Sequence, residues 1–176
     1  VHEFESVRLL QQIQAFNKGI DPSFGELTDN KTFIFSGAAA DPNCRNERSL
    51  KNRMSRKKEA GARFIQTQMV MEKENLIDFC ENISNPLEIP VIAGVFLLKS
   101  YKNALFINKY VPGANIPEHI LNRLKNAKEP LQEGIDIAAE QAHDFINIAS
   151  GIHLMAVKTE HLIPEILKKA GLNLEY

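Results

Sequence analysis

The sequence lacks an excess of charge of either sign. Its 176 residues include 21 lysines and arginines and 22 aspartates and glutamates, which leaves a formal net charge of −1. The longest run of like charge is the basic triplet at residues 56–58. This balance argues against a protein that binds nucleic acid or another polyanion, although it leaves room for a single nucleotide cofactor.

Cysteines and long hydrophobic runs are also scarce. Cys44 and Cys80 are the only cysteines, and their separation matches no metal-ligand spacing, so we expect two free thiols in a reducing compartment. A structural disulfide is the less favoured alternative. No apolar run approaches the roughly 18 residues of a membrane span, and no signal-peptide pattern opens the sequence. We therefore expect a cytoplasmic protein that has no membrane partner.

Common signatures of nucleotide binding and proton transfer are missing as well. The sequence has no glycine-rich phosphate loop of the GxGxxG or Walker type. Among its scattered histidines, only His153 falls on a predicted strand, where a core residue is the better interpretation than a base. No Ser-His-Asp or Cys-His arrangement can be assembled, and Glu72 and Glu160 are the acids nearest to predicted strand ends. The residues themselves therefore indicate no catalytic group and no metal ligand.

The sequence does contain a regular alternation of helical and strand patterns. With 44% apolar residues it can bury the core of one domain, which we take to span residues 1–176. Apolar residues at helical spacing predict an opening helix over residues 3–17 and then a loop. Strands are predicted at residues 32–37, 63–69, 91–96 and 152–157. Helices are predicted at residues 47–60, 73–83, 100–109, from 117 onward, 131–149 and 162–170.

Short apolar strands joined by helices favour parallel pairing with right-handed crossovers. No hairpin turn of the Asn-Gly type separates any two of the predicted strands. Four strand–helix units form either half of a (β/α)8 barrel or a small doubly wound sheet, and periodicity does not separate these two α/β architectures. In both of them, ligands bind at the carboxyl ends of the parallel strands.

Three consecutive polar residues, Gln66, Thr67 and Gln68, interrupt the predicted strand at residues 63–69. Gln68 falls at the carboxyl end, and its amide offers a ligand both a donor and an acceptor. The alternative is a side chain that pairs with loop backbone, because buried amides are usually satisfied internally. Lys57 also has two interpretations, as one cation of a solvated basic helix face or as a phosphate or ribose contact beside the strand ends.

Four segments of the sequence resemble, in order, the methylenetetrahydrofolate reductase family. The first segment ends a strand with Gly-Ala-Ala, and the second is a basic helix followed by a strand that ends in Thr-Gln. The third is a further strand–helix unit. The fourth is a turn and helix, which the last strand follows later in the chain. The segments read DNKTFIFSGAAADPN, RKKEAGARFIQTQMVME, PVIAGVFLLKSYKNALF, and NKYVPGANIPEHILNRL with GIHLMAVKTEHLIPEIL. They are most similar to the branch that is often fused to homocysteine methyltransferase domains.

The resemblance implies a TIM-type (β/α)8 barrel that holds FAD at the carboxyl ends of its strands. In that family NAD(P)H or another reductant reduces the flavin, which then converts 5,10-methylenetetrahydrofolate to 5-methyltetrahydrofolate. Such a barrel needs roughly 250 residues, so the resemblance makes this chain the C-terminal half, strands 5–8. Val1 is not a methionine, and we expect a longer parent protein whose first strand carries the catalytic glutamate.

The open edges of a half barrel are expected to associate, either with the missing N-terminal half or with a second copy of the chain. The chain alone is then expected to be inactive. The alternative function is that of a non-catalytic subunit, or a stable fragment, which keeps the scaffold and acts by binding a partner.

The resemblance also assigns site residues. Gln68 matches the glutamine that binds the folate pterin and the nicotinamide, and Lys57 matches the lysine that contacts the flavin cofactor. Gly37 and Asp41 stand at cofactor-binding positions where many bacterial members have a tyrosine and a histidine. Asn103 replaces a substrate-contacting glutamine and is one methylene shorter.

One further substrate contact departs from the family pattern. The aromatic residue that covers the ligand is replaced by Ile107, and Tyr101 is the nearby aromatic side chain that stands in for it.

Overall fold

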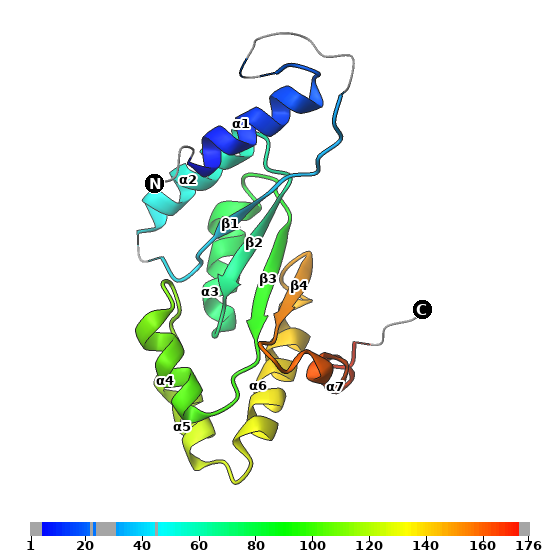
Figure 1. Cartoon of the computed structure of the whole chain (residues 1–176). Coiled ribbons are helices and arrows are strands. Elements are labelled where there is room, and N and C mark those ends of the chain that lie inside the picture. Colours follow the sequence, from blue (N-terminus) through cyan, green and yellow to red (C-terminus); the bar gives the residue numbers. More distant parts are fainter. Residues whose placement is uncertain (1–4, 22, 24–30, 45, 173–176) are drawn as a thin grey trace.

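The computed structural model describes residues 5–21, 23, 31–44 and 46–172 of the chain. Within these residues the backbone forms one sheet of four strands (Figure 1). The strands are β1 (Gly37–Ala40), β2 (Phe64–Met69), β3 (Val91–Phe96) and β4 (Gly151–Met155). They lie in chain order and every neighbouring pair is parallel. The predicted α/β class, with parallel strands in sequential order, is confirmed.

Helices alternate with these strands as predicted. They are α1 (Ser6–Asn17), α2 (Glu47–Glu59), α3 (Lys73–Phe79), α4 (Tyr101–Tyr110), α5 (Glu118–Asn126), α6 (Pro130–Phe145) and α7 (Ile163–Lys169). A π-helical turn over Cys80–Ser84 extends α3, and a 3₁₀ turn over Glu160–Leu162 leads into α7. The first residues of the helix predicted at 3–17, and most of the loop that follows it, fall outside the described residues. No helix in the described ranges is long and apolar enough to cross a membrane.

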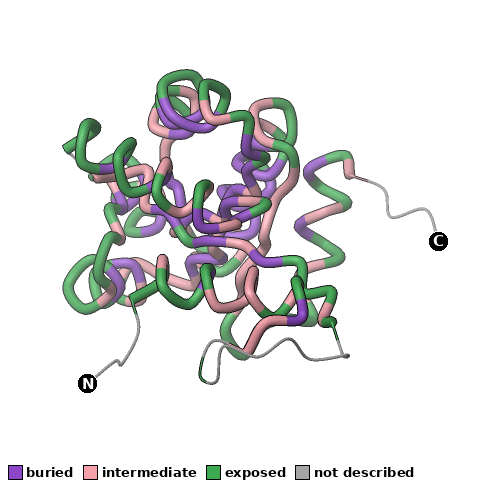
Figure 2. Tube along the Cα trace, turned by 90° about the horizontal axis from the view of Figure 1, so that it is seen from above, coloured by how far each residue is buried: buried purple, intermediate pink, exposed green. Residues whose placement is uncertain are grey.

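Helices α2, α3 and α6 cover one face of the sheet (Figure 1). Alternate residues of β2 turn toward these helices, so Ile65 and Met69 are buried whereas Phe64, Gln66 and Gln68 are only partly covered. The main core lies between the helices and the sheet and includes Leu50, Met54, Ile65, Leu76 and Phe145. Figure 2 shows buried positions on the helix sides that face inward. The opposite face of the sheet is therefore the open one in the described part of the chain.

A second core lies beyond the carboxyl ends of the strands, where α4 and α5 pack against α6. It includes Leu98, Ala104, Ile107, Leu124 and Ile137. The ion pairs of Arg123 join α5 to α6, with Nε 2.6 Å from Glu133 and the two terminal nitrogens 2.6 and 2.9 Å from Glu140. These ion pairs thereby hold α5 against α6.

The prediction of a first buried strand at residues 32–37 is wrong. Phe33 and Phe35 are 94% and 73% exposed, and the strand that joins the sheet begins only at Gly37. The backbone of Ile34 pairs instead with the Asn17 side chain at the end of α1. Asn17 Nδ2 donates to Ile34 O at 3.0 Å, and Ile34 N donates to Asn17 Oδ1 at 2.9 Å. The Asn17 amide thus makes the hydrogen bonds to the Ile34 backbone that a neighbouring strand would make in a sheet.

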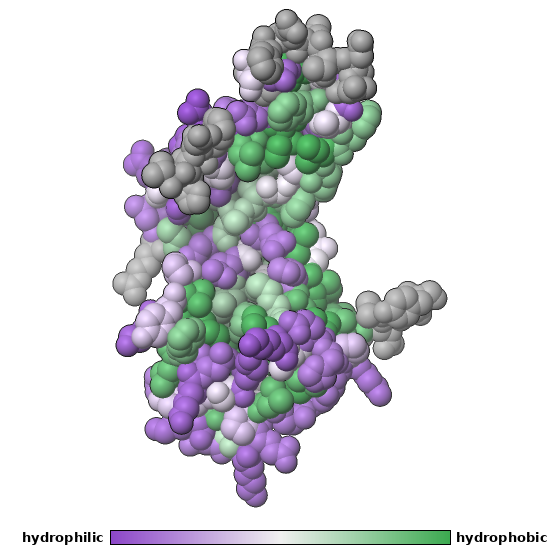
Figure 3. Space-filling view, in the orientation of Figure 1, coloured by the Kyte–Doolittle hydropathy of each residue, from purple (hydrophilic) through white to green (hydrophobic). Residues whose placement is uncertain are grey.

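Small residues, rather than β-branched or aromatic ones, form β1 because the neighbouring strand brings a large ring against it. Gly37 pairs with Phe64, and a Cβ at Gly37 would overlap the Phe64 ring. Phe35 stacks on the same ring, with centroids 5.7 Å apart. The segment leading into β1 therefore forms a hydrophobic surface, which is visible in the upper right part of the molecule in Figure 3.

Candidate functional site

The carboxyl edge of β1 and β2 brings two of the predicted site residues together. Asp41 follows β1 directly, and Gln68 is the second-last residue of β2. Both lie beside Gly113 in the turn between α4 and α5. A Cβ on Gly113 would stand 2.6 Å from Asp41 Oδ2 and 3.6 Å from Gln68 Cγ. The carboxyl ends of parallel strands lie at the same edge of the sheet, so two side chains that are 27 positions apart in sequence meet here.

Gln68 uses both ends of its amide on the protein backbone. Its Nε2 donates to Pro112 O at 3.1 Å, and its Oε1 accepts from Met69 N at 2.9 Å. In this structure the side chain therefore braces the turn between α4 and α5, which is the alternative that the sequence left open. Because the amide is only partly covered, the bond to Pro112 is one that a competing ligand can replace.

The other two polar residues of β2 are also paired. Thr67 Oγ1 accepts from Gly94 N at 2.9 Å and donates to Gln68 O at 2.7 Å. These bonds replace ladder bonds where the register of β2 and β3 shifts between Gln66 and Met69. Gln66 Nε2 lies 2.7 Å from His153 Nδ1 on β4. The polar run in the strand is thus accounted for by a local bulge and by one bond across the sheet.

Lys57 reaches the same edge from α2. Its ammonium donates to the backbone oxygen of Ala39 in β1, 2.8 Å away. Burial, with a smaller contribution from the nearby Arg53 guanidinium, lowers the pKa of Lys57 below its ordinary value. A partly desolvated cation gains more from an anionic partner than a fully hydrated one does. Lys57 therefore holds a partly desolvated cation near the end of β1.

Gly37 does not reach this edge. The sequence analysis placed it at the end of its strand, and that placement is wrong because Gly37 is the first residue of β1. It lies at the amino end, under the ring of Phe64, while Asp41 lies beyond the opposite end. The structure therefore does not bring Gly37 together with Lys57 and Asp41.

Asn103 and Tyr101 occupy the first turn of α4. Asn103 Oδ1 accepts from Lys99 N at 3.1 Å, and Asn103 N donates to Ser100 Oγ at 3.1 Å, so this side chain helps to cap the helix. Tyr101 is half-buried, and Lys125 Nζ lies 5.8 Å from its ring centroid. The ten residues of α4 span about 15 Å, and Gln68 contacts the turn at the other end of this helix. The two predicted substrate contacts thus stand apart from Gln68.

Ile107, which replaces the covering aromatic residue, cannot serve as a cover. It is only 3% exposed and packs in the second core. Tyr101 remains the one predicted aromatic contact that has an accessible face.

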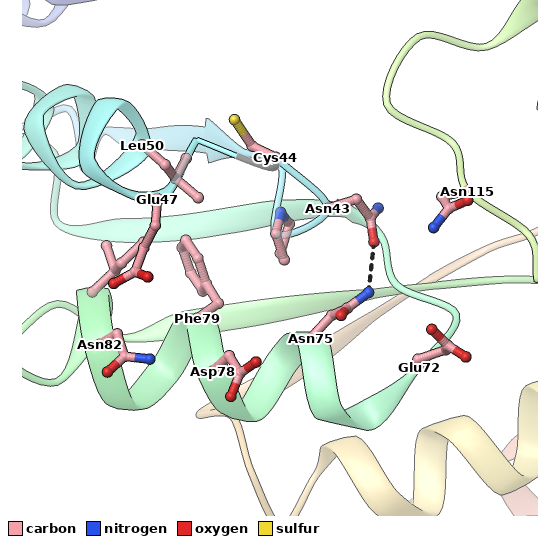
Figure 4. Close-up of a pocket in the computed structure, with 12 residues that line it drawn as sticks. Asn43, Cys44, Glu47, Leu50, Glu72, Asn75, Asp78, Phe79, Asn82 and Asn115 are labelled. Carbon is pink, nitrogen blue, oxygen red and sulfur yellow. Dashed lines mark hydrogen bonds between the residues drawn. The ribbon is translucent and has the colours of Figure 1, made fainter.

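A cleft of about 390 Å³ opens between α2 and α3, on the helical side of the sheet (Figure 4). Asn75 Nδ2 donates to Asn43 Oδ1 across it at 3.2 Å. The carboxylates of Glu47, Glu72 and Asp78 line the cleft. Among the described residues, its lining contains no lysine or arginine. An acidic lining disfavours a diphosphate or a folate tail. We therefore place the candidate site at the carboxyl edge and not in this cleft.

Neither acid singled out in the sequence stands at the candidate site. Glu72 lines the cleft, 3.9 Å from the imidazole of His119. Glu160 is exposed beside α7, where backbone N–H groups of Glu160 and Lys158 lower the pKa of its carboxyl group. Within the described residues no three potential ligands gather to hold a metal ion, and both cysteines are free. The carboxylate that the structure does place at the described edge is that of Asp41, beside Gln68 and Gly113.

Comparison with known proteins identifies the family. The model of the methylenetetrahydrofolate reductase family matches residues 20–171. The chain is 34% identical over 131 residues to methylenetetrahydrofolate reductase 2 of Schizosaccharomyces pombe, covering 66% of this chain and 20% of that protein. It is 32% identical over 123 residues to the probable methylenetetrahydrofolate reductase (NADPH) of Caenorhabditis elegans, covering 65% of this chain and 18% of that protein. The chain spans about a fifth of the length of these relatives. It belongs to the methylenetetrahydrofolate reductase family.

Proposed function

We propose that this chain supplies strands 5–8 of a (β/α)8 barrel in an FAD-dependent reductase. That enzyme would convert 5,10-methylenetetrahydrofolate to 5-methyltetrahydrofolate, with NAD(P)H or another reductant. The observation that carries the proposal is that Asp41 and Gln68 meet at the carboxyl edge of a parallel sheet in a chain of this family, while Lys57 binds the backbone of β1 at Ala39. This edge is where barrels of this type bind their ligands.

The residues of this edge suit FAD in chemical terms. FAD carries an anionic diphosphate, which fits the partly desolvated ammonium of Lys57. Asp41 would repel phosphate but can accept hydrogen bonds from ribose or ribityl hydroxyls. Gln68 offers a donor and an acceptor to the pterin or the nicotinamide. Bound FAD would supply the hydride-transfer chemistry, and the role of these side chains would be to bind and orient.

The rest of the barrel is the partner that we propose for the open sheet. In the described residues β1 and β4 each pair on one side only, and unpaired strand edges associate readily. The exposed rings of Phe33 and Phe35 lie next to β1 and would be covered by the preceding strands of a closed barrel. A second copy of the chain is the other candidate for this surface.

A non-catalytic role is the second candidate function. One observation favours it: the amide of Gln68 is satisfied by backbone groups in this structure. In that case the chain would keep the scaffold and bind a partner without turnover.

Expression of the complete reading frame that contains this chain tests the proposed function. We expect the purified protein to show the absorbance of bound flavin and to oxidise NAD(P)H, or another donor, in the presence of 5,10-methylenetetrahydrofolate. A protein that neither retains nor takes up FAD, and shows no folate-dependent turnover, would favour the non-catalytic role.

Substitution of Lys57 by alanine tests the cofactor contact. We expect the affinity for FAD to fall roughly tenfold, because a charge-assisted hydrogen bond to the diphosphate would be lost. Activity should return when excess FAD is added. Lys51→Ala removes the same charge from an exposed position on α2 and is the matched control. Equal flavin affinity in the two variants, measured by fluorescence titration, would remove Lys57 from the site.

A further inference from the structure

A hydrogen bond spans three strands on the open face of the sheet. Gln66 on β2 and His153 on β4 are joined at 2.7 Å between Nε2 and Nδ1, and β3 runs between them. On β4, Ile152 and Leu154 pack toward the main core. His153, which lies between them in sequence, therefore turns to the face without helices. It is only half-buried there.

Gly94 lies on the strand between the two bonded side chains. It is the register partner of His153 on the intervening strand, and it is itself buried although it lies in the middle of the open face. A Cβ at Gly94 would stand 2.9 Å from the carbonyl oxygens of both Thr67 and Gln68, so the bulge in β2 requires glycine at this position. Gln66 has Ile92 as its register partner on β3, two residues before Gly94, so its side chain reaches diagonally across β3 to meet the imidazole.

The pairing fixes which imidazole nitrogen carries the proton. An amide nitrogen only donates, so His153 Nδ1 must accept, and the neutral ring then carries its proton on Nε2. His153 Nε2 makes no hydrogen bond within the described part of the chain. The bond to Gln66 therefore fixes the tautomer in which His153 Nε2 is an N–H donor. This donor lies on the open face, close to the bulge that ends in Gln68.

Such a donor is unusual for the inner face of a parallel barrel. Inner layers of these barrels are filled mainly by branched apolar side chains. A donor enclosed there without an acceptor would be costly. In a closed barrel, His153 Nε2 accordingly needs an acceptor, either from the strands that complete the barrel or from a ligand that enters its mouth.

We propose that His153 binds the ring system of a bound ligand through Nε2–H, and that Gln66 positions the imidazole for this contact. The ligand group would be a carbonyl oxygen or an unprotonated ring nitrogen of a flat heteroaromatic ring, of the kind that flavins and pterins carry. This inference rests on the proposed function and adds two residues to its site. His153 makes the contact, and Gln66 acts through His153.

The experiment uses the complete protein, with FAD and 5-methyltetrahydrofolate as probes. We expect His153→Phe, which keeps an aromatic ring without the donor, to weaken the binding of one probe about tenfold. Gln66→Leu should weaken the same probe by a smaller factor, because the ring can still find the right orientation part of the time. In the His153→Phe background, Gln66→Leu should have no further effect. Gln11→Leu makes the same change on the exposed face of α1 and should leave both affinities unchanged.

A spectroscopic measurement checks the positioning role independently of binding. In ¹⁵N-histidine-labelled protein, we expect the His153 ring as the Nε2–H tautomer, and a mixture of tautomers in Gln66→Leu. An Nδ1–H ring in the unsubstituted protein, or folded His153→Phe protein that binds both probes normally, would overturn the proposal while the proposed function stands. If the unsubstituted protein binds neither probe, the proposed function fails and this inference fails with it.

Discussion

Replacement of Gly134 by alanine is expected to destabilise the protein by about 3 kcal/mol or more. Gly134 lies in α6 and packs against the chain just after β3, where a Cβ would overlap the carbonyl oxygen of Leu98. Leu98 is fully buried, so the backbone has no room to withdraw. In an open helix the same change would stabilise by about 1 kcal/mol. The sign of the effect therefore reports directly on the packing of α6 against this backbone.

Denaturant unfolding measures this effect, and Gly151→Ala is the control. Gly151 begins β4, and a Cβ there would meet nothing within 4 Å. We expect its free energy of unfolding to change by no more than about 0.5 kcal/mol. If Gly134→Ala were as stable as the unsubstituted protein, α6 could not approach the sheet as closely as the structure has it.

Substitution of Gln68 by alanine in the complete protein is expected to lower kcat/KM for the folate by roughly ten- to a hundredfold, with FAD retained. The loss of one or two hydrogen bonds to a bound ligand corresponds to about 1–3 kcal/mol of transition-state stabilisation. Gln68→Glu distinguishes the role of the amide donor from that of the amide acceptor. It keeps an acceptor for Met69 N and loses the donor that now contacts Pro112. We expect a similar loss of activity from both variants.

The competing explanation is that Gln68 only braces the turn between α4 and α5. Asn108 braces the same turn from within, since its amide donates to Ile116 O at 2.9 Å and accepts from Ile116 N at 2.7 Å. Asn108→Ala therefore loosens the turn and leaves the Gln68 amide in place. Matching kinetics and thermal stability in Gln68→Ala and Asn108→Ala, with an unchanged KM for folate, would show that Gln68 has no role in ligand binding.

Local pattern alone determined most of the fold. The strands at 63–69, 91–96 and 152–157 and the helices between them are set by apolar periodicity and by end signals such as Ser100, whose side chain accepts from Asn103 N as an N-cap. These signals involve neighbours a few residues apart, so they can be read without the fold. The location of Gln68 at a strand end and of Lys57 on the preceding helix also follows from them.

Contacts between distant residues decided the rest. The backbone of Ile34 pairs with the Asn17 side chain instead of joining the sheet, and the Phe64 ring leaves room only for glycine at position 37. No local pattern reveals either contact, because the partners are 17 and 27 positions apart in sequence.

Contacts between distant residues also decided which polar side chains meet on the open face. The apposition of Asp41, Gln68 and Gly113, and the bond from Gln66 to His153 across β3, exist only when the parallel strands and the α4–α5 turn are assembled. The sequence by itself thus determined most of the helices and strands and their parallel order. Tertiary packing decided which side chains meet, because hydrogen bonds and steric exclusion act through space between residues that chain order keeps apart.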